Sequence, residues 1–245
     1  MKLTVPARAK RSNLRGMVAP IKSRIPVVGR GSIYYLKITL ADVKPPIWRR
    51  LRVPGEANLG WLHAVIQVAM GWTNSHLHQF TCGGTVYSDP GFDLDEFEDD
   101  PKIFDEGRAT LQKIAPKLKS VLVYEYDFGD SWDHLITVER ILPADSAVAP
   151  GAECLDGARA CPPEDCGGVC GYADLLKILR DPGHEEHASM LGWLGRPFDP
   201  EVFNRDSTNQ HLRMLPWPKT TESPLRRVLK HRDGFKGWRG DETPA

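Results

Sequence analysis

The chain has 245 residues, 41% of them hydrophobic and 26% charged, which is ordinary for a globular protein. The sequence has no apolar run near the roughly 18 residues that a membrane-spanning helix needs, and no apolar secretory segment near its N-terminus. Five cysteines are an odd number for a disulfide framework, in a chain long enough to bury a core without one. We therefore expect a cytoplasmic protein.

The formal net charge of zero hides an uneven distribution of charge along the chain. Residues 1–41 carry nine Lys or Arg and no acid, residues 42–215 carry 16 basic and 28 acidic residues, and residues 216–245 carry seven basic and four acidic residues. We predict a disordered basic tail over 1–31, one domain over 32–215 and a mostly disordered tail over 216–245. The tails are either solvated extensions or arms that contact nucleic acid or an acidic protein surface.

In the first half of the domain, residue patterns predict two strands, a helix and a hairpin. Residues 33–40 and 47–53 are rich in β-branched and aromatic residues, as in strands. Asn58 is a candidate N-cap for a helix over 59–70 whose apolar residues cover most of its surface, as in a helix packed deep against a sheet. We expect His63 on that helix to be buried and hydrogen-bonded. Residues 77–82 and 85–87 flank Gly83-Gly84 as in a hairpin.

Nine acidic residues lie between Asp89 and Glu106, interspersed with Pro and Gly. This composition is typical of a loop. It is either a solvated surface loop or a cation-binding loop, although the EF-hand pattern is absent.

Residues 121–128 and 132–141 form the clearest predicted hairpin. A two-residue turn at Gly129-Asp130 would pair Asp127 with Trp132 and Glu125 with His134, and apolar residues on both faces indicate a central hairpin. After Pro143 we expect a loop through the cysteine-rich block. Short helices are predicted over 172–179, 185–194 and 209–215, with a helical turn at Asp199-Pro200. The expected fold class is a single α+β domain. Its antiparallel or mixed sheet has five or six strands, with one long buried helix on a face and short C-terminal helices.

The hairpin sequence YEYDFGDSWDH gathers acids, aromatics and a histidine in one short run. Asp127, Asp130 and His134 are the candidates for general acid–base chemistry or for holding a divalent cation. A mononuclear metal site would need a further ligand, for which the candidates by residue type are His76, His78, His184 and His187. Candidate binding residues are Glu125, Trp132, His78, Glu164 and Asp165. The alternative is that these polar residues serve turns and hydrogen bonds.

Four cysteines lie within 17 residues and are candidate ligands of a structural zinc: Cys154, Cys161, Cys166 and Cys170. The spacing of Cys166 and Cys170 fits a zinc ligand pair, whereas that of Cys154 and Cys161 is wide. Plain reduced thiols are the competing interpretation, and a disulfide is the third. We expect no cofactor other than this zinc.

Five ordered blocks resemble the plasmid pRiA4b ORF-three-like family of uncharacterised bacterial and archaeal proteins. They are residues 34–54, residues 63–80, the hairpin sequence, CPPEDCGG and residues 184–203, and the resemblance covers about residues 32–215. It implies one compact α+β domain, often encoded on plasmids or beside transposable elements, and it supplies no catalytic residues that can be carried over to this chain. Because members often have Pro or Gly where this chain has Cys170, the resemblance weakens the case for a zinc site common to the family.

Two hypotheses for function remain. The first is a non-enzymatic interaction module associated with plasmids or transposable elements, whose basic tails contact nucleic acid. The second is a metal-dependent, hydrolase-like enzyme that uses Asp127, Asp130 and His134. The chain has no P-loop, no dinucleotide-binding glycine motif and no nucleophile elbow, which disfavours the common NTPases, nucleotide-cofactor enzymes and α/β-hydrolases. The sequence favours binding over catalysis.

Overall fold

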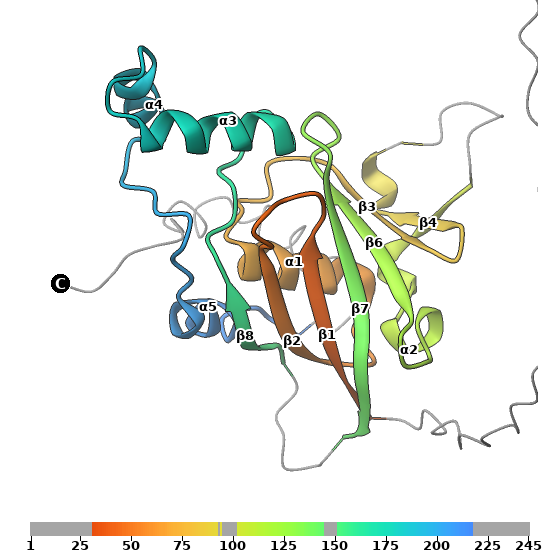
Figure 1. Cartoon of the computed structure of the whole chain (residues 1–245). Coiled ribbons are helices and arrows are strands. Elements are labelled where there is room, and N and C mark those ends of the chain that lie inside the picture. The colour runs from red at the N-terminus through yellow and green to blue at the C-terminus, as the bar shows by residue number, and fades with distance from the viewer. Residues whose placement is uncertain (1–30, 93, 95–101, 145–150, 218–245) are drawn as a thin grey trace, which may run out of the picture.

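The computed structural model describes residues 31–92, 94, 102–144 and 151–217. These residues form one mixed eight-stranded sheet in the order β5-β4-β3-β6-β7-β1-β2-β8 (Figure 1). All neighbouring strands are antiparallel except β4 and β5. The strands are β1 (Ser32–Leu40), β2 (Trp48–Pro54), β3 (His78–Cys82), β4 (Thr85–Ser88), β5 (Ile103–Asp105), β6 (Val121–Tyr126), β7 (Trp132–Pro143) and β8 (Glu153–Ala158).

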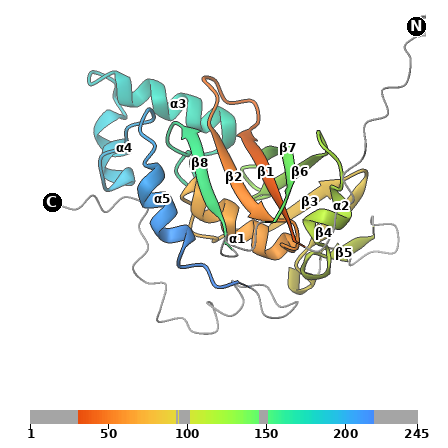
Figure 2. The same ribbon diagram turned by 90° about the horizontal axis from the view of Figure 1, so that it is seen from below.

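The helix α1 lies against one face of the sheet with α5 beside it, whereas α3 and α4 lie together at one end of the sheet (Figure 2). The helices are α1 (Leu59–Met70), α2 (Leu111–Ile114), α3 (Gly168–Arg180), α4 (His187–Leu194) and α5 (Arg205–Leu212), with 3₁₀ turns η1 (Pro90–Phe92) and η2 (Glu106–Arg108). The predicted α+β class is confirmed, although the sheet is wider than the five or six strands expected. None of the described helices is both long and apolar enough to cross a membrane.

Alternation along β1 shows how the sheet divides into two faces. Tyr34, Leu36, Ile38 and Leu40 are buried beneath the helices, whereas the residues between them are only partly buried. Because successive side chains of a strand point to opposite faces, one face of the sheet builds the core and the other is open.

The boundaries of α1 follow from its capping residues, of which Asn58 was predicted as the N-cap. The Asn58 side chain accepts a hydrogen bond from the Trp61 backbone N–H, and Gly71 ends the helix in the left-handed region at φ 99°. Eleven of the twelve residues are buried. A helix that is apolar around most of its circumference must be covered on all sides, and here the sheet, α5 and η2 surround it.

The predicted pairing of the β6–β7 hairpin is wrong by one residue. Tyr126 pairs with Trp132, Glu125 with Asp133 and Tyr124 with His134, so the loop comprises residues 127–131 rather than two residues. A one-residue shift moves side chains to the opposite face. Trp132 and His134 therefore enter the core. The hairpin is central in the sheet, but its apolar residues are not buried on both faces, because Val121, Val123 and Leu135 are exposed on the open face.

The region after Pro143 contains a strand where the sequence predicted a loop. β8 pairs with β2 and forms one edge of the sheet. Its outer edge is covered by Asn209 of α5, whose side-chain amide accepts from the Cys154 N–H at 2.7 Å and donates to the Cys154 carbonyl at 2.9 Å. The helices predicted at 172–179 and 185–194 are present as α3 and α4, and the one at 209–215 begins earlier, as α5. Asp199-Pro200 forms only a turn.

Candidate functional site

Three loops meet at one end of the sheet. They are the α1–β3 loop (residues 71–77), the β6–β7 loop (residues 127–131) and the β8–α3 loop (residues 159–167). Figure 1 shows the β6–β7 loop beside the beginning of α3. The Asp127 N–H donates to the Leu77 carbonyl at 2.8 Å, and the Gly167 N–H donates to Asp130 Oδ2 at 3.1 Å. These bonds fix the β6–β7 loop against the other two.

One side chain from each loop contributes to a group of potential metal ligands, which we call the cation cluster: His76, Asp127 and Asp165. One ligand atom of each residue lies within 4.8 Å of the others. His76 Nε2 is 3.2 Å from Asp165 Oδ1 and 3.6 Å from Asp127 Oδ2. The Nε2 atom itself is buried, although the His76 side chain is 25% exposed. This nitrogen forms no hydrogen bond of acceptable geometry with either carboxylate. Among the described residues no other His, Cys, Asp and Glu side chains gather in this way.

Asp127 is held in an orientation that leaves one carboxylate oxygen for the cluster. Its Oδ1 accepts hydrogen bonds from the backbone N–H groups of Gly129 at 3.0 Å and Asp130 at 3.4 Å. Oδ2 is the oxygen that faces His76. The side chain is only 11% exposed, whereas that of Asp165 is 71% exposed, so the cluster opens to solvent at Asp165.

Two cluster residues have a left-handed backbone, Asp127 at φ 61° and Asp165 at φ 59°. Asn74 and Ser131 in the same loops also have positive φ, at 59° and 52°. Non-glycine residues in this region are uncommon and cost of order 1 kcal/mol each, so surrounding hydrogen bonds must hold them there. Such residues concentrate at binding and catalytic sites.

Glu164, next to Asp165, connects the β8–α3 loop to the other two. Its carboxylate accepts from the Tyr126 hydroxyl at 2.6 Å and from both the N–H and the hydroxyl of Thr73. Burial, and secondly the Glu164 carboxylate, raise the pKa of Tyr126. The phenol therefore stays protonated and donates.

The other predicted catalytic residues have different surroundings. Asp130 accepts from the Gly167 N–H at the start of α3, so its carboxylate serves the helix N-terminus. His134 is fully buried, and its Nδ1 lies 2.9 Å from the Trp132 carbonyl oxygen. Burial lowers the pKa of His134 to about 4, which keeps the ring neutral. The structure thus brings Asp127 to the cluster, and places His134 in the core.

Several predicted binding residues also pack away from the cluster. His78 is buried and its Nε2 bonds Glu106 at 2.8 Å, while Trp132 is 1% exposed. Glu125 lies on the open face, where it accepts from the Gln79 amide at 2.7 Å. Of the other candidate histidines, His187 Nδ1 bonds the Ile178 carbonyl at 2.8 Å, between α3 and α4.

His63 is buried and hydrogen-bonded, as the sequence suggested. Its Nδ1 lies 2.8 Å from the Tyr124 hydroxyl, and its Nε2 lies 2.6 Å from Asn74 Oδ1. The helix residue Gln67 also donates to the Tyr124 hydroxyl, at 3.0 Å. The Tyr124 hydroxyl thus links β6 to α1, and His63 itself links α1 to Asn74 in the loop that carries His76.

The four candidate zinc cysteines do not come together as a group of ligands within the described residues. All five cysteines are free thiols. Burial raises the pKa of Cys154 to about 11 and that of Cys166 to about 12, and it raises the pKa of Cys161 still further above its usual value. These three thiols are therefore protonated at neutral pH.

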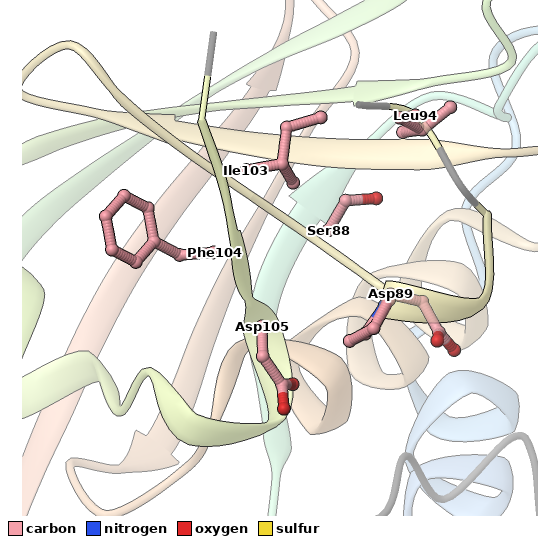
Figure 3. Close-up of a pocket in the computed structure, with 7 residues that line it drawn as sticks. Ser88, Asp89, Leu94, Ile103, Phe104 and Asp105 are labelled. Carbon is pink, nitrogen blue, oxygen red and sulfur yellow. The ribbon is translucent and has the colours of Figure 1, made fainter. Parts of the chain in front are cut away.

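A small pocket lies at the β5 edge of the sheet, between β4 and β5 (Figure 3). Its described lining residues are Ser88, Asp89, Pro90, Leu94, Ile103, Phe104 and Asp105. It adjoins the acidic segment 89–106, most of which lies outside the described residues, so the predicted choice between a solvated and a cation-binding loop stays open there.

Sequence reasoning named His76 only as a candidate by residue type, and named Asp165 only as a binding residue. No spacing rule connects positions 76, 127 and 165, because they approach one another only through the pairing of β3, β6 and β7 and the return of the chain through β8.

The fold and the site define an α+β protein with a mixed sheet and a three-loop polar site at one sheet end. The chain belongs to the family described as "Plasmid pRiA4b ORF-3-like protein", whose profile matches residues 32–207. It is 42% identical over 167 residues to "Uncharacterized protein y4hQ" of Sinorhizobium fredii, covering 67% of this chain and 81% of that protein. It is also similar to the crystal structure of a protein of unknown function from Methanosarcina mazei Go1. That match has a TM-score of 0.63 and 35% identity, and covers 71% of this chain and 95% of the other.

Proposed function

We propose that this chain is a divalent-cation-binding module and that His76, Asp127 and Asp165 are the protein ligands. The observation that carries the proposal is the convergence of one imidazole nitrogen and two carboxylate oxygens, within 4.8 Å of one another, from three separate loops. The buried His76 Nε2 without a hydrogen bond supports it, because an unsatisfied buried nitrogen is costly and a cation would satisfy it.

The ligand set indicates the kind of cation and its use. One imidazole and two carboxylates suit zinc or manganese, whereas calcium and magnesium prefer all-oxygen sites. Three protein ligands leave coordination positions for water or for a binding partner, unlike the four ligands of a closed structural zinc site. The exposed side of the cluster at Asp165 gives such a partner access.

The competing account is that a protonated His76 bridges the two carboxylates without metal. Isothermal titration of the chelator-stripped, reduced full chain with Mn²⁺ and Zn²⁺ separates the two accounts. One site per chain is expected. It should be lost in Asp127→Asn, weakened in Asp165→Asn, where the more exposed ligand is changed, and retained in Asp174→Asn, whose carboxylate is exposed on α3 and pairs with Lys177. An ion that Asp127→Asn retains and Cys166→Ser loses would place the metal on the cysteines and overturn the proposal.

The open coordination positions also suit a metal-dependent hydrolase, with His76 rather than His134 as the histidine ligand. Turnover of ester or phosphodiester substrates that requires both the metal and Asp127 would favour catalysis. Metal binding without turnover would favour an interaction module, which is the function we prefer because the family resemblance offers no catalytic residues.

Contact with nucleic acid is a second candidate, and the charge distribution of the sequence supports it. The basic segments lie largely outside the described residues, and the association with plasmids rests on the wording of the family's description alone. Binding to DNA or RNA should weaken steeply with salt and on removal of residues 1–31. Binding that ignores both changes would contradict this candidate.

A further inference from the structure

The residue directly before each member of the cation cluster belongs to one hydrogen-bond network. Ser75 precedes His76, Tyr126 precedes Asp127 and Glu164 precedes Asp165. The Ser75 N–H donates to the Tyr126 hydroxyl oxygen at 2.9 Å, and that hydroxyl donates to Glu164 Oε1 at 2.6 Å. The phenol of Tyr126 therefore joins the residues that precede all three ligands, in addition to the bonds from Asp127 to Leu77 and from Gly167 to Asp130.

Packing and additional hydrogen bonds restrict the side chains of this network. Tyr126 is fully buried, and its ring stacks on Trp72 with centroids 4.9 Å apart. Thr73 adds two further donors to Glu164, so the beginning of the α1–β3 loop is fixed to the β8–α3 loop at more than one point. The hydroxyl is consequently held by packing on one side and by hydrogen bonds on the other.

We infer that Tyr126 is a positioning residue that sets the spacing of His76, Asp127 and Asp165 through its hydroxyl group, an inference that rests on the proposed cation site. A phenol that joins the preceding residue of each ligand constrains all three ligand backbones at once. It also helps to hold Asp165 in its left-handed conformation, since Glu164 is anchored on the residue before it. Outer residues that orient metal ligands are typically worth about 10- to 100-fold in metal affinity.

The neighbouring Tyr124 provides a matched control. It lies two residues earlier on β6, on the same face, and is equally buried. Its hydroxyl bonds His63 and Gln67, neither of which precedes a cluster residue. Tyr124→Phe therefore removes a buried hydroxyl from the same strand without removing the bonds between the three loops.

The test is Mn²⁺ affinity of the full chain, measured by titration for the wild type, Tyr126→Phe and Tyr124→Phe, with thermal unfolding to confirm that each is folded. We expect about 10- to 100-fold weaker binding in Tyr126→Phe and a change of less than about twofold in Tyr124→Phe. Wild-type affinity in Tyr126→Phe would overturn the inference and leave the cation site standing. Equal weakening in both variants would also overturn it, since the cause would then be a loosened strand.

A double-mutant cycle gives a readout that general destabilisation would not move. In Asp165→Ala, any residual Mn²⁺ affinity should be less sensitive to Tyr126→Phe, because one of the positioned ligands is already gone. Should Tyr126→Phe not fold, Glu164→Gln breaks the same network nearer to solvent and should weaken binding in the same direction. Absence of Mn²⁺ and Zn²⁺ binding to the wild type would overturn both the cation site and this inference.

Discussion

The imidazole rings of His63 and His78 are stacked in the core, with centroids 3.5 Å apart and planes 4° from parallel. Both side chains are almost completely buried. Burial lowers the pKa of His78 to about 3 and that of His63 well below its usual value, the latter also because a proton on His78 would repel a second one. The pair is therefore neutral when the protein is folded.

This pair predicts loss of stability in mild acid. The folded pKa values lie below the unfolded value of about 6.5, so the unfolded chain binds more protons below that pH. The stability that the neutral pair contributes is complete above about pH 6.5. It is lost as the pH falls towards the pKa values of the two histidines in the folded protein. Each histidine should add up to about 1.4 kcal/mol per pH unit to the slope. Urea unfolding between pH 7.5 and 4.5 measures it.

A substitution of the fully buried His134 can be compared with the wild type by the same urea unfolding against pH. His134→Phe removes a third neutral histidine and should reduce the slope of the unfolding free energy against pH, even though lost hydrogen bonds lower the stability at pH 7. An unchanged slope would show that His134 does not take up a proton on unfolding.

Arg49 is 1% exposed, and we expect its substitution to destabilise the fold. Its guanidinium donates to the carbonyls of Ala69 at 2.8 Å and Ala158 at 3.0 Å and lies 3.8 Å from the Phe203 ring centroid. Arg49→Met should lower the unfolding free energy by about 2 kcal/mol, because buried carbonyls lose their donors. Chemical denaturation measures this loss.

Arg52 is the matched control for Arg49, since it lies on the same strand but on the open face. It pairs with Glu153 at 2.8 Å, and the side chains of Arg52 and Glu153 are 20% and 47% exposed. Arg52→Met should cost less than about 1 kcal/mol. Equal losses in the two variants would contradict the assigned role of Arg49.

Gly168, in the CPPEDCGG block, lies where a larger side chain would clash with the β6–β7 loop. Its φ is 66°, and a Cβ atom there would lie 2.6 Å from the Asp130 carbonyl oxygen. Gly168→Ala should destabilise the protein by about 2 kcal/mol or more, through strain and through separation of α3 from the β6–β7 loop. Gly192→Ala in α4, where a Cβ meets nothing within 4 Å, should be neutral or slightly stabilising. Thermal unfolding compares the two.

Because the Asn209 side chain bonds both the N–H and the carbonyl of Cys154, we expect it to protect the edge strand β8 from hydrogen exchange. Asn209→Ala should cost about 1–2 kcal/mol and should accelerate hydrogen exchange at the Cys154 amide, which then loses its acceptor. Gln210→Ala, an exposed neighbour on α5, should leave that amide protected. Slow exchange at Cys154 in both variants would show that something else covers the edge.

Local pattern was enough to predict α1, since Asn58, Gly71 and the apolar circumference each act within a few residues of sequence. It was not enough for the β6–β7 hairpin, where Asp127 and Ser131 adopt left-handed conformations that usually belong to glycine. The resulting five-residue loop changed the faces of Trp132 and His134. β8 was missed because its sequence ECLDGA has no β-branched residue, and its pairing with β2 comes from tertiary structure.

The cation cluster shows the same division between local and long-range information. Asp127 could be proposed from its hairpin, and Asp165 from its cysteine-rich block, because both blocks are unusual in composition. Neither block indicates His76 as the partner. That assignment depends on the loop after α1 reaching the β6–β7 loop through the hydrogen bond from Asp127 to the Leu77 carbonyl.

The most direct test of the cation site is anomalous diffraction from crystals of the full chain grown with Mn²⁺ or Zn²⁺. We predict one strong peak bounded by His76 Nε2, Asp127 Oδ2 and Asp165 Oδ1, at about 2.0–2.2 Å from each atom. A peak at the cysteines, or no peak at His76 with the ion present in excess, would contradict the account.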